Sequence, residues 1–154
     1  MSMSKTEKLS HYAVVLIAVM AVIVSFWQVR IAQEHNRLSV RPYMDFFYGW
    51  TSATNLQLKL SNQGVGPAII TQVEHYYKGQ RYNTWDDLLK ASGLNEYRKS
   101  SYQYGGKSPF ASGNEIVFLE LELSENEKSL LNEIRTIVHY ESIYQEPFEL
   151  EIIF

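Results

Sequence analysis

The stretch LQLKLSNQGVGPAIITQVEHYY, residues 56–77, decides the fold. In its first part leucines alternate with polar residues, which predicts a β-strand with one buried face. The buried face holds Leu56, Leu58 and Leu60, and the outward face holds Asn55, Gln57 and Lys59. Residues 68–77 predict another strand, so the glycine-rich centre must connect the two.

The connection contains four residues that suit a tight turn, namely Asn62, Gly64, Gly66 and Pro67. Asn62 is able to bond its own backbone, the two glycines permit positive φ angles, and Pro67 fixes the exit. We therefore expect a structural turn, either a hairpin or a corner between two sheets. The alternative is a glycine-rich phosphate loop, but that loop requires a following helix, and residues 68–71 are strand-like.

Alternation with period two recurs toward both ends of the chain. The predicted apolar faces are Met44, Phe46, Tyr48 and Trp50 in one strand, Val117, Leu119, Leu121 and Leu123 in a second, and Phe148, Leu150, Ile152 and Phe154 in a third. Residues 134–144 predict a further strand that is apolar on parts of both faces.

Two short helices interrupt the predicted strands. Thr84 is a suitable N-cap for the first helix, and Gly93 is a suitable end. Residues 124–127, SENE, match a capping box for the second helix. Short strands with turn signals and little helix favour a mainly β fold over a parallel α/β sheet. We predict an immunoglobulin-like antiparallel β-sandwich with two short helices over residues 41–154.

Residues 12–29 are predicted to form one transmembrane helix. The segment 12–27, YAVVLIAVMAVIVSFW, contains no charged residue. Sixteen helical residues span about 24 Å, and extension through residue 29 approaches the ~30 Å thickness of a hydrocarbon core. Tyr12 and Trp27 are positioned as interfacial anchors, and Arg30 is positioned to snorkel. A cleaved signal peptide is the alternative, but the apolar run continues past the small residue Ala21.

The predicted organisation has four parts: a tail over residues 1–11, the membrane span over 12–29, a helical stalk over 30–40 and the sandwich over 41–154. The stalk has no Pro or Gly before Pro42, and its Gln, Arg, Ala and Glu residues favour helix. Both flanks of the span are basic, and the count of Lys and Arg favours a cytoplasmic sandwich by a narrow margin.

Charge is distributed unevenly along the chain, whose net charge is −3. Residues 115–154 hold two Lys or Arg against ten Asp or Glu. This balance argues against nucleic-acid binding, because a phosphate backbone requires clustered basic residues on one face. The absence of cysteine excludes disulfides and thiolate metal sites.

Three segments carry a resemblance to known sequences: EHNRLSVRPYMDF at 34–46, LSNQGVGPAII at 60–70 and VHYESIYQEPFE at 138–149. They resemble a group of uncharacterised bacterial single-pass membrane proteins with an HNRLSVRP junction and a β-sandwich that contains an NxGxGPA turn. In that group a glycine is expected after Tyr144, where this chain has Gln145. The resemblance implies a bacterial inner (plasma) membrane protein, and it brings no established activity.

A candidate enzymatic constellation consists of His75, His139 and Glu141. His139 and Glu141 lie two residues apart, so they share a face of the predicted strand. Nothing in the sequence brings His75 to them, and a lone strand histidine is more often a surface or core residue than a metal ligand. Motifs for a serine nucleophile are absent. We therefore expect no cofactor and favour a protein that is not an enzyme.

The richest candidate for a binding surface is residues 97–110, YRKSSYQYGGKSPF. Rigid aromatic residues and adaptable polar residues occur together there, as they do in binding loops. The candidate contacts are Tyr97, Arg98, Lys99, Tyr102, Tyr104, Lys107 and Phe110. An ordinary solvated insertion is the alternative, and the basic residues are also suited to anionic lipid headgroups.

These features favour a membrane-anchored interaction or assembly module whose partners are the lipid bilayer, through residues 12–29, and another protein. The alternative is a membrane-attached, hydrolase-like enzyme that uses His75, His139 and Glu141. A homo-oligomer formed through the small residues Ala13, Ala18 and Ala21 is also open, although the span has no GxxxG motif.

Overall fold

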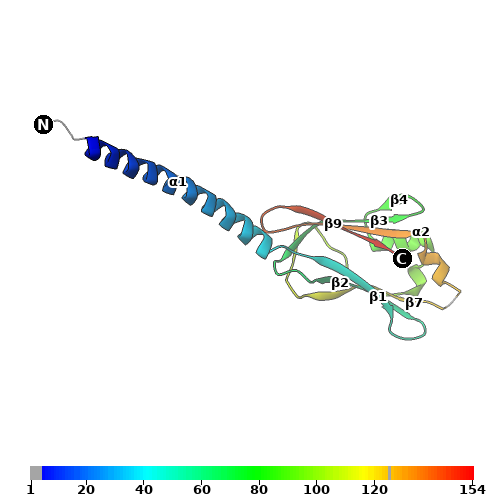
Figure 1. The fold of residues 1–154 in the computed structure, drawn as a ribbon. Coiled ribbons are helices and arrows are strands. Elements are labelled where there is room, and N and C mark those ends of the chain that lie inside the picture. The colour runs from blue at the N-terminus through cyan, green and yellow to red at the C-terminus, as the bar shows by residue number, and fades with distance from the viewer. Residues whose placement is uncertain (1–4, 125) are drawn as a thin grey trace. The chain divides into compact units, whose positions relative to one another are not determined.

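The computed structural model describes residues 5–124 and 126–154, and the chain divides after Ser39 into two compact units (Figure 1). The first unit is the helix α1, Lys5–Ser39. The second unit, residues 40–154, is built mainly from strands.

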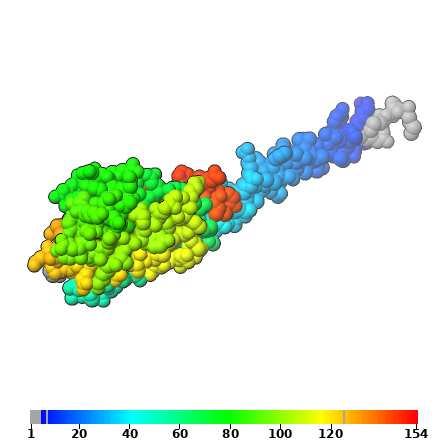
Figure 2. Space-filling model, turned by 180° about the vertical axis from the view of Figure 1, so that it is seen from behind, coloured from blue at the N-terminus to red at the C-terminus, as the bar shows by residue number. Residues whose placement is uncertain are grey.

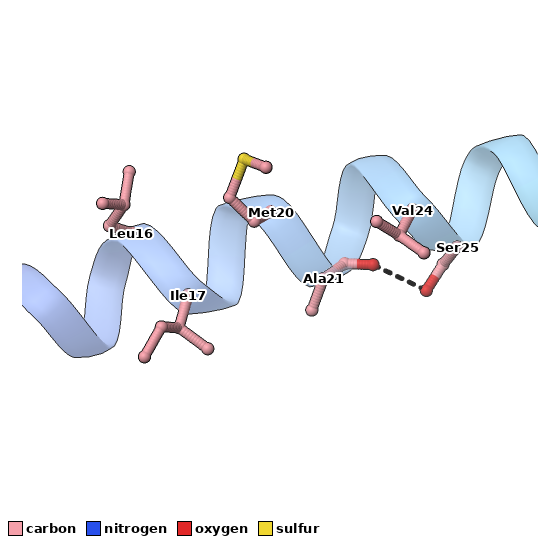
Figure 3. A pocket seen from close by; sticks show the side chains of 6 residues that line it. All are labelled: Leu16, Ile17, Met20, Ala21, Val24 and Ser25. Carbon is pink, nitrogen blue, oxygen red and sulfur yellow. Dashed lines mark hydrogen bonds between the residues drawn. The ribbon is translucent and has the colours of Figure 1, made fainter.

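Helix α1 is continuous through both the predicted span and the predicted stalk. Its 35 residues extend for about 52 Å. The most apolar 18-residue window has a mean hydropathy of 2.3, and none of it is buried, so the helix is long and apolar enough to cross a membrane. The Ser25 hydroxyl donates to the Ala21 carbonyl oxygen at 2.8 Å, which satisfies it within an apolar surface (Figure 3). The helix ends three residues before Pro42, as the steric demands of proline favour.

The second unit contains two antiparallel sheets, as the sequence predicts (Figure 1). The first sheet has the order β1-β2-β7-β5, with bounds Met44–Trp50, Asn55–Asn62, Glu115–Glu122 and Arg98–Ser101. The second sheet has the order β4-β3-β8-β9, with bounds Gln80–Tyr82, Ala68–Tyr77, Ile134–Glu141 and Pro147–Ile153. Strand β6, Ser108–Phe110, pairs with the start of β3.

This strand order is that of an immunoglobulin-like sandwich. In chain order β1, β2, β3, β5, β7, β8 and β9 take the places of strands A to G, which gives sheets ABED and CFG. Strand β4 adds one further strand beside β3 at the edge of the second sheet. The connection between β2 and β3 is therefore a corner between sheets, which is one of the two turn geometries that the sequence allows.

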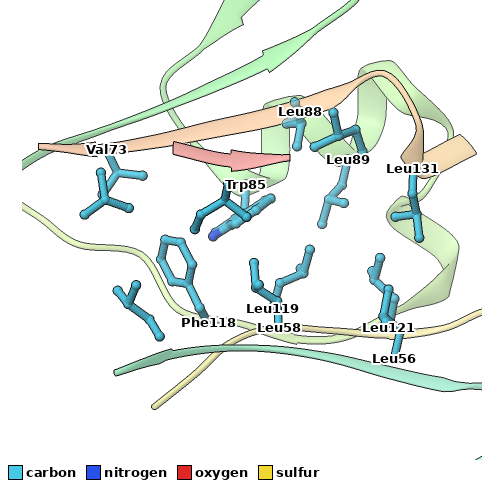
Figure 4. Close-up of a cluster of buried hydrophobic side chains, with 14 of the residues drawn as sticks. Leu56, Leu58, Val73, Trp85, Leu88, Leu89, Phe118, Leu119, Leu121 and Leu131 are labelled. Carbon is cyan, nitrogen blue, oxygen red and sulfur yellow. The ribbon is translucent and has the colours of Figure 1, made fainter. Parts of the chain in front are cut away.

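The core lies between the sheets and is closed by helix α2, Trp85–Ser92 (Figure 4). The predicted ends of α2 are confirmed: the Thr84 hydroxyl accepts from the Asp87 amide, and Gly93 takes the left-handed conformation. Trp85, Leu88 and Leu89 point from α2 into the space between the sheets and are buried there.

The predicted core face of β7 is wrong at one residue. A β-bulge lies opposite Leu58 and Lys59, where Leu119 and Val117 are the partners and Phe118 is the extra residue. Phe118 consequently points inward and is fully buried, whereas Val117 is only half-buried. Strict alternation cannot reveal this, because a bulge shifts the phase of the pattern by one residue.

Other sequence expectations need correction at the margins of the sandwich. Strand β1 lies at a sheet edge, so Tyr48 and Trp50 on its predicted apolar face are exposed. The second predicted helix is a single 3₁₀ turn, η2, Lys128–Leu131. The Ser124 amide donates to the Glu127 carboxylate at 2.7 Å, as in a capping box, while Glu125 lies outside the described residues.

The turn between β2 and β3 is organised by the buried amide of Asn62. Its Oδ1 accepts from the amides of Tyr43 at 3.2 Å and Gly64 at 3.0 Å. Its Nδ2 donates to the carbonyl oxygens of Gly66 at 2.9 Å and Phe110 at 3.2 Å. The expected bond from Asn62 to its local backbone is therefore present, and it is joined by bonds to two distant segments.

The reason for glycine in this turn differs from the expected one. Neither Gly64 nor Gly66 has a positive φ. Instead a Cβ on Gly66 would lie 1.7 Å from the Val40 carbonyl oxygen, and a Cβ on Gly64 would lie 2.2 Å from the Tyr43 nitrogen. Both glycines are required because the start of the domain passes directly against the turn.

The hairpin between β8 and β9 holds a non-glycine residue in a left-handed conformation. Gln145 has a φ of 61°. Its amide donates to the Ser142 carbonyl at 2.9 Å, and the Ser142 amide donates to the Glu146 carbonyl at 3.0 Å. This closed hairpin requires the positive φ, so Gln145 occupies the place where the resembling group is expected to have glycine.

We predict that Gly66→Ala destabilises the domain much more than Gly106→Ala. A side chain at Gly66 clashes with backbone that cannot move without breaking the turn, whereas Gly106 has open space and only a positive φ of 65°. The Gly106 variant is expected to lose about 1 kcal/mol, and the Gly66 variant several times as much. Urea denaturation of both variants measures the difference, and equal midpoints would contradict the close-approach explanation.

We also predict that Gln145→Gly stabilises the domain. Relief of the left-handed strain is worth about 1 kcal/mol or more, partly offset by the greater entropy of glycine in the unfolded chain. The matched control is Gln80→Gly, an exposed residue with no positive φ. The expected outcome is a higher melting temperature for the first variant alone, and a lower one would show that the hairpin does not depend on this φ.

Candidate interaction surface

The tyrosine-rich segment 97–110 crosses from one sheet to the other. It begins at the end of a 3₁₀ turn, η1, Asn95–Tyr97, then forms β5 at the edge of the first sheet and β6 on the second. Figure 2 shows the side of the domain on which the middle of the chain, coloured green to yellow-green, forms the surface. The segment is thus a structural crossover as well as a surface feature.

The three basic residues of this segment each have an acidic partner. Arg98 pairs with Asp86, Lys99 Nζ lies 3.3 Å from the Glu122 carboxylate, and Lys107 Nζ lies 2.6 Å from the Glu141 carboxylate. Each pair ties the segment to another element of the fold. Each carboxylate offsets much of the long-range field of its basic partner, which disfavours binding of these residues to anionic headgroups.

The aromatic residues of the segment divide into buried and exposed ones. Phe110 is buried in the core, and Tyr104 packs its ring against Phe110 and Phe118. Burial raises the pKa of the Tyr104 hydroxyl well above its usual value. The negative charge of Glu127 raises the pKa of the half-buried Tyr97. Tyr102 is 50% exposed, and its ring centroid lies 4.9 Å from that of Tyr104, so its ring has a fixed support.

The candidate enzymatic residues are not brought together. His75 pairs with Thr136 across β3 and β8, and both side chains face the core. His139 lies three residues beyond Thr136 on β8, which places it on the opposite, outer face with Glu141. The sheet itself separates His75 from the other two, so the proposed trio cannot share a metal ion or a proton. Among the described residues no group of three or more His, Asp or Glu side chains is arranged to hold a metal ion.

His75 instead belongs to the core. Its Nδ1 lies 3.0 Å from the Thr136 hydroxyl, and its ring centroid lies 4.0 Å from that of Trp85. Among the described residues, neither its Nε2 nor the Trp85 Nε1 has a hydrogen-bond partner. Burial lowers the pKa of His75 from 6.5 to about 4, because the charged imidazolium would lose its hydration in the core.

The outer face of the second sheet is covered by a polar network centred on Glu74. The Tyr76 hydroxyl donates to the Glu74 carboxylate at 2.6 Å, and Arg81 pairs with it at 2.9 Å. The bond from Tyr76, followed by the charge of Arg81, lowers the pKa of Glu74. His139 Nε2 lies 3.8 Å from Glu74, and its Nδ1 lies 3.9 Å from Glu149. The network satisfies these groups mutually, which is typical of a solvated face.

A surface that the sequence does not predict lies where strands β1 and β9 run along the same side of the sandwich. We call it the aromatic seam, and it consists of Phe46, Tyr48, Phe148, Leu150 and Phe154. The Tyr48 and Phe154 ring centroids lie 6.2 Å apart, and the Arg41 guanidinium lies 4.6 Å above the Phe148 ring. Its one sequence signal is that two strands with apolar faces, 44–50 and 148–154, stand at the two ends of the predicted domain.

The proposed membrane anchors are exposed along α1. Tyr12, Trp27 and Arg30 belong to the same continuous helix, and the first two lie fifteen residues apart, which corresponds to about 22 Å along the axis. These residues therefore have the side-chain freedom that interfacial anchoring requires.

We predict that the domain loses stability as pH falls from 6.5 to 4, through His75. The unfolded chain binds a proton at His75 below pH 6.5, while the folded domain resists protonation until about pH 4. The contribution of His75 to the free energy of unfolding is therefore fully present above pH 6.5. It decreases by about 3 kcal/mol as the pH falls from 6.5 to 4. Glu74, Glu120 and Glu127 have lowered pKa values, so their contributions decrease only below about pH 4.5.

Urea unfolding of full-length protein at several pH values measures this effect. His75→Gln keeps a hydrogen-bonding group for Thr136 but does not titrate, so its stability is expected to be nearly constant from pH 6.5 to 4.5. His139→Gln, on the outer face, is the matched control and should retain the slope of the original protein. An unchanged slope in His75→Gln would contradict the assignment.

The comparison with known families assigns the chain to a family but does not assign it an activity. A family model described as a domain of unknown function (DUF8453) matches residues 9–153. No curated protein matches the chain. The matched range contains most of α1 and all the described strands of the sandwich. The chain therefore belongs to the DUF8453 family.

Proposed function

We propose that this protein is a membrane-anchored interaction module, in which α1 holds a binding sandwich at the bilayer surface. The observation that carries this proposal is the combination of one exposed apolar helix with a separate folded unit. An exposed apolar helical surface of this length is typical of a segment that lies in lipid, which supports the proposal. The sandwich supports a binding role because its candidate catalytic side chains point to opposite faces of a sheet.

The membrane assignment includes three finer proposals. Residues 12–29 cross the bilayer, and residues 30–39 continue as a helical stalk. The membrane is the inner membrane of a bacterium, as the resemblance of the junction and turn sequences implies. The sandwich is cytoplasmic, which rests on the slight excess of Lys and Arg after the span.

Within the tyrosine-rich segment, Tyr102 is the residue that we propose for contact with a partner protein. Its ring is exposed and is supported by Tyr104, so binding costs little side-chain entropy. The remaining residues of the segment support the proposal indirectly, because their ion pairs and core contacts fix the position of Tyr102.

Membrane extraction followed by cross-linking tests the proposal. Full-length protein is expected to stay in the membrane fraction after washing with alkaline carbonate, whereas a chain without residues 1–29 is expected to be soluble and folded. A photo-cross-linker placed at Tyr102 in native membranes should capture one defined protein. The matched control is the same cross-linker at Lys90, which is exposed on α2.

The proposal fails if carbonate releases the full-length protein, because the helix then does not anchor the chain. It also fails if the two cross-linker positions capture the same diffuse set of proteins. Capture of a defined partner by the Lys90 position alone would retain an interaction module but would contradict the role of Tyr102.

A further inference from the structure

The edge strands of the two sheets differ in their capacity to pair with another chain. Among the described strands, β4, β5 and β6 contain only three, four and three residues, and β6 contains Pro109. The two long edge strands are β1 and β9, with seven residues each. A strand of that length is able to accept an added strand if its outward backbone groups are free.

In the first half of strand β1, the outward backbone amides already face groups of the same chain. The Gln63 amide donates to the Tyr43 carbonyl, and the Thr51 amide donates to the Asn55 carbonyl. These two bonds show that the odd-numbered residues of β1 direct their backbone groups toward β2. Residues 44, 46, 48 and 50 therefore direct their amides away from β2. The Met44 amide faces the buried Tyr140 hydroxyl, and the Phe46 amide donates to the Asp45 carboxylate at 2.8 Å.

Strand β9 has a longer uncapped edge. The Ser142 amide donates to the Glu146 carbonyl, so Glu146 belongs to a hydrogen-bonded pair of the antiparallel ladder. Every second residue after it, namely 148, 150 and 152, therefore bonds β8. Residues 149, 151 and 153 direct their amides outward, and β9 pairs with no described strand except β8. Pro147 has no amide hydrogen, so the available edge begins at Glu149.

The side chains of β9 specify what such an added strand must look like. Glu149 and Glu151 point to the outer face. The Glu149 side chain is 70% exposed, and the Glu151 side chain, which pairs with Arg135 of β8 at 3.0 Å, remains 45% exposed. Phe148, Leu150 and Phe154 point to the aromatic seam and are only partly covered. A second copy of β9 would place Glu opposite or beside Glu, which disfavours self-pairing. An added strand with basic residues outward and apolar residues inward complements both faces.

We propose that β9 is a β-augmentation site for an extended segment in which basic and apolar residues alternate. The added strand bonds the outward amides and carbonyls of residues 149, 151 and 153. Its basic residues lie beside Glu149 and Glu151, and its apolar residues cover the seam. This inference rests on the proposed interaction function and names the chemistry of its partner.

The test uses full-length protein in detergent micelles and three synthetic seven-residue peptides. The first alternates Lys and Val, the second alternates Glu and Val, and the third is the Lys–Val peptide with proline at its centre. Hydrogen exchange is measured by NMR. At a Lys–Val peptide concentration of about nine times its Kd, the amides of residues 149, 151 and 153 should exchange about tenfold more slowly. The other two peptides should leave exchange unchanged.

Charge-reversal variants supply the matched comparison. Glu149→Lys combined with Glu151→Lys should weaken binding of the Lys–Val peptide by about tenfold or more. Glu96→Lys combined with Glu122→Lys makes the same change in net charge on η1 and the first sheet, and it should leave the affinity unchanged. If the first pair does not fold, Glu149→Gln combined with Glu151→Gln takes its place and should weaken binding in the same direction.

Three results would overturn the inference: no slowing of exchange with the Lys–Val peptide, slowing at Tyr48 and Trp50 in place of β9, or equal binding of the Glu–Val peptide. These outcomes are separate from the membrane experiment. A partner captured at Tyr102 together with an unresponsive β9 edge would retain the interaction module and reject this binding mode.

Discussion

The fold of the sandwich depends most on the buried side-chain amide of Asn62. All four of its hydrogen-bonding positions are used, and they join the start of the domain, the corner turn and strand β6. Its backbone also bonds residues 113 and 114, beside the start of β7. A buried polar group that loses a partner costs about 1–3 kcal/mol, so replacement of Asn62 would disturb four segments together. The close approach at Gly64 and Gly66 follows from the same arrangement, because Asn62 draws residues 40–43 against the turn.

The centre of the core shows how an immunoglobulin-like sandwich forms without a disulfide. In antibody domains a bridge between strands B and F packs against a tryptophan on strand C. Here the strand C position is β3, where His75 bonds Thr136 of β8, and Trp85 reaches the same place from α2. Aromatic packing of His75, Trp85 and Phe118 replaces the covalent link. The consequence is a core that holds a titratable group, through which we expect its stability to depend on pH.

The sequence predicts the long strands and helices well, but it predicts the short edge strands and the long-range contacts poorly, for physical reasons. Strands β2 and β3 alternate because each has one buried face, and β9 alternates because one of its faces is partly covered. The ends of α2 follow from the local capping chemistry of Thr84 and Gly93. Strands β4, β5 and β6 are short and polar, so no period marks them. The bulge at Phe118, the ion pairs of the tyrosine-rich segment and the separation of His75 from His139 depend on partners distant in sequence. Local patterns contain no information about those partners.

The proposed function follows from where hydrogen-bonding capacity remains unused. On both outer faces charged groups pair with each other, as Lys59 does with Glu115 and Arg135 with Glu151. Among the described residues, outward backbone groups without a partner lie along the β9 edge and, over a shorter stretch, at Tyr48 and Trp50 of β1, and the β9 edge adjoins the half-covered rings of the aromatic seam. Three outward residues provide few hydrogen bonds, so an added strand alone would bind weakly. In the proposed function, membrane anchoring would compensate for this weakness, because a partner anchored in the same membrane would meet the edge at a high effective concentration. The proposed interaction module therefore depends on both parts, because the edge alone would bind a partner weakly and the helix alone offers no strand edge.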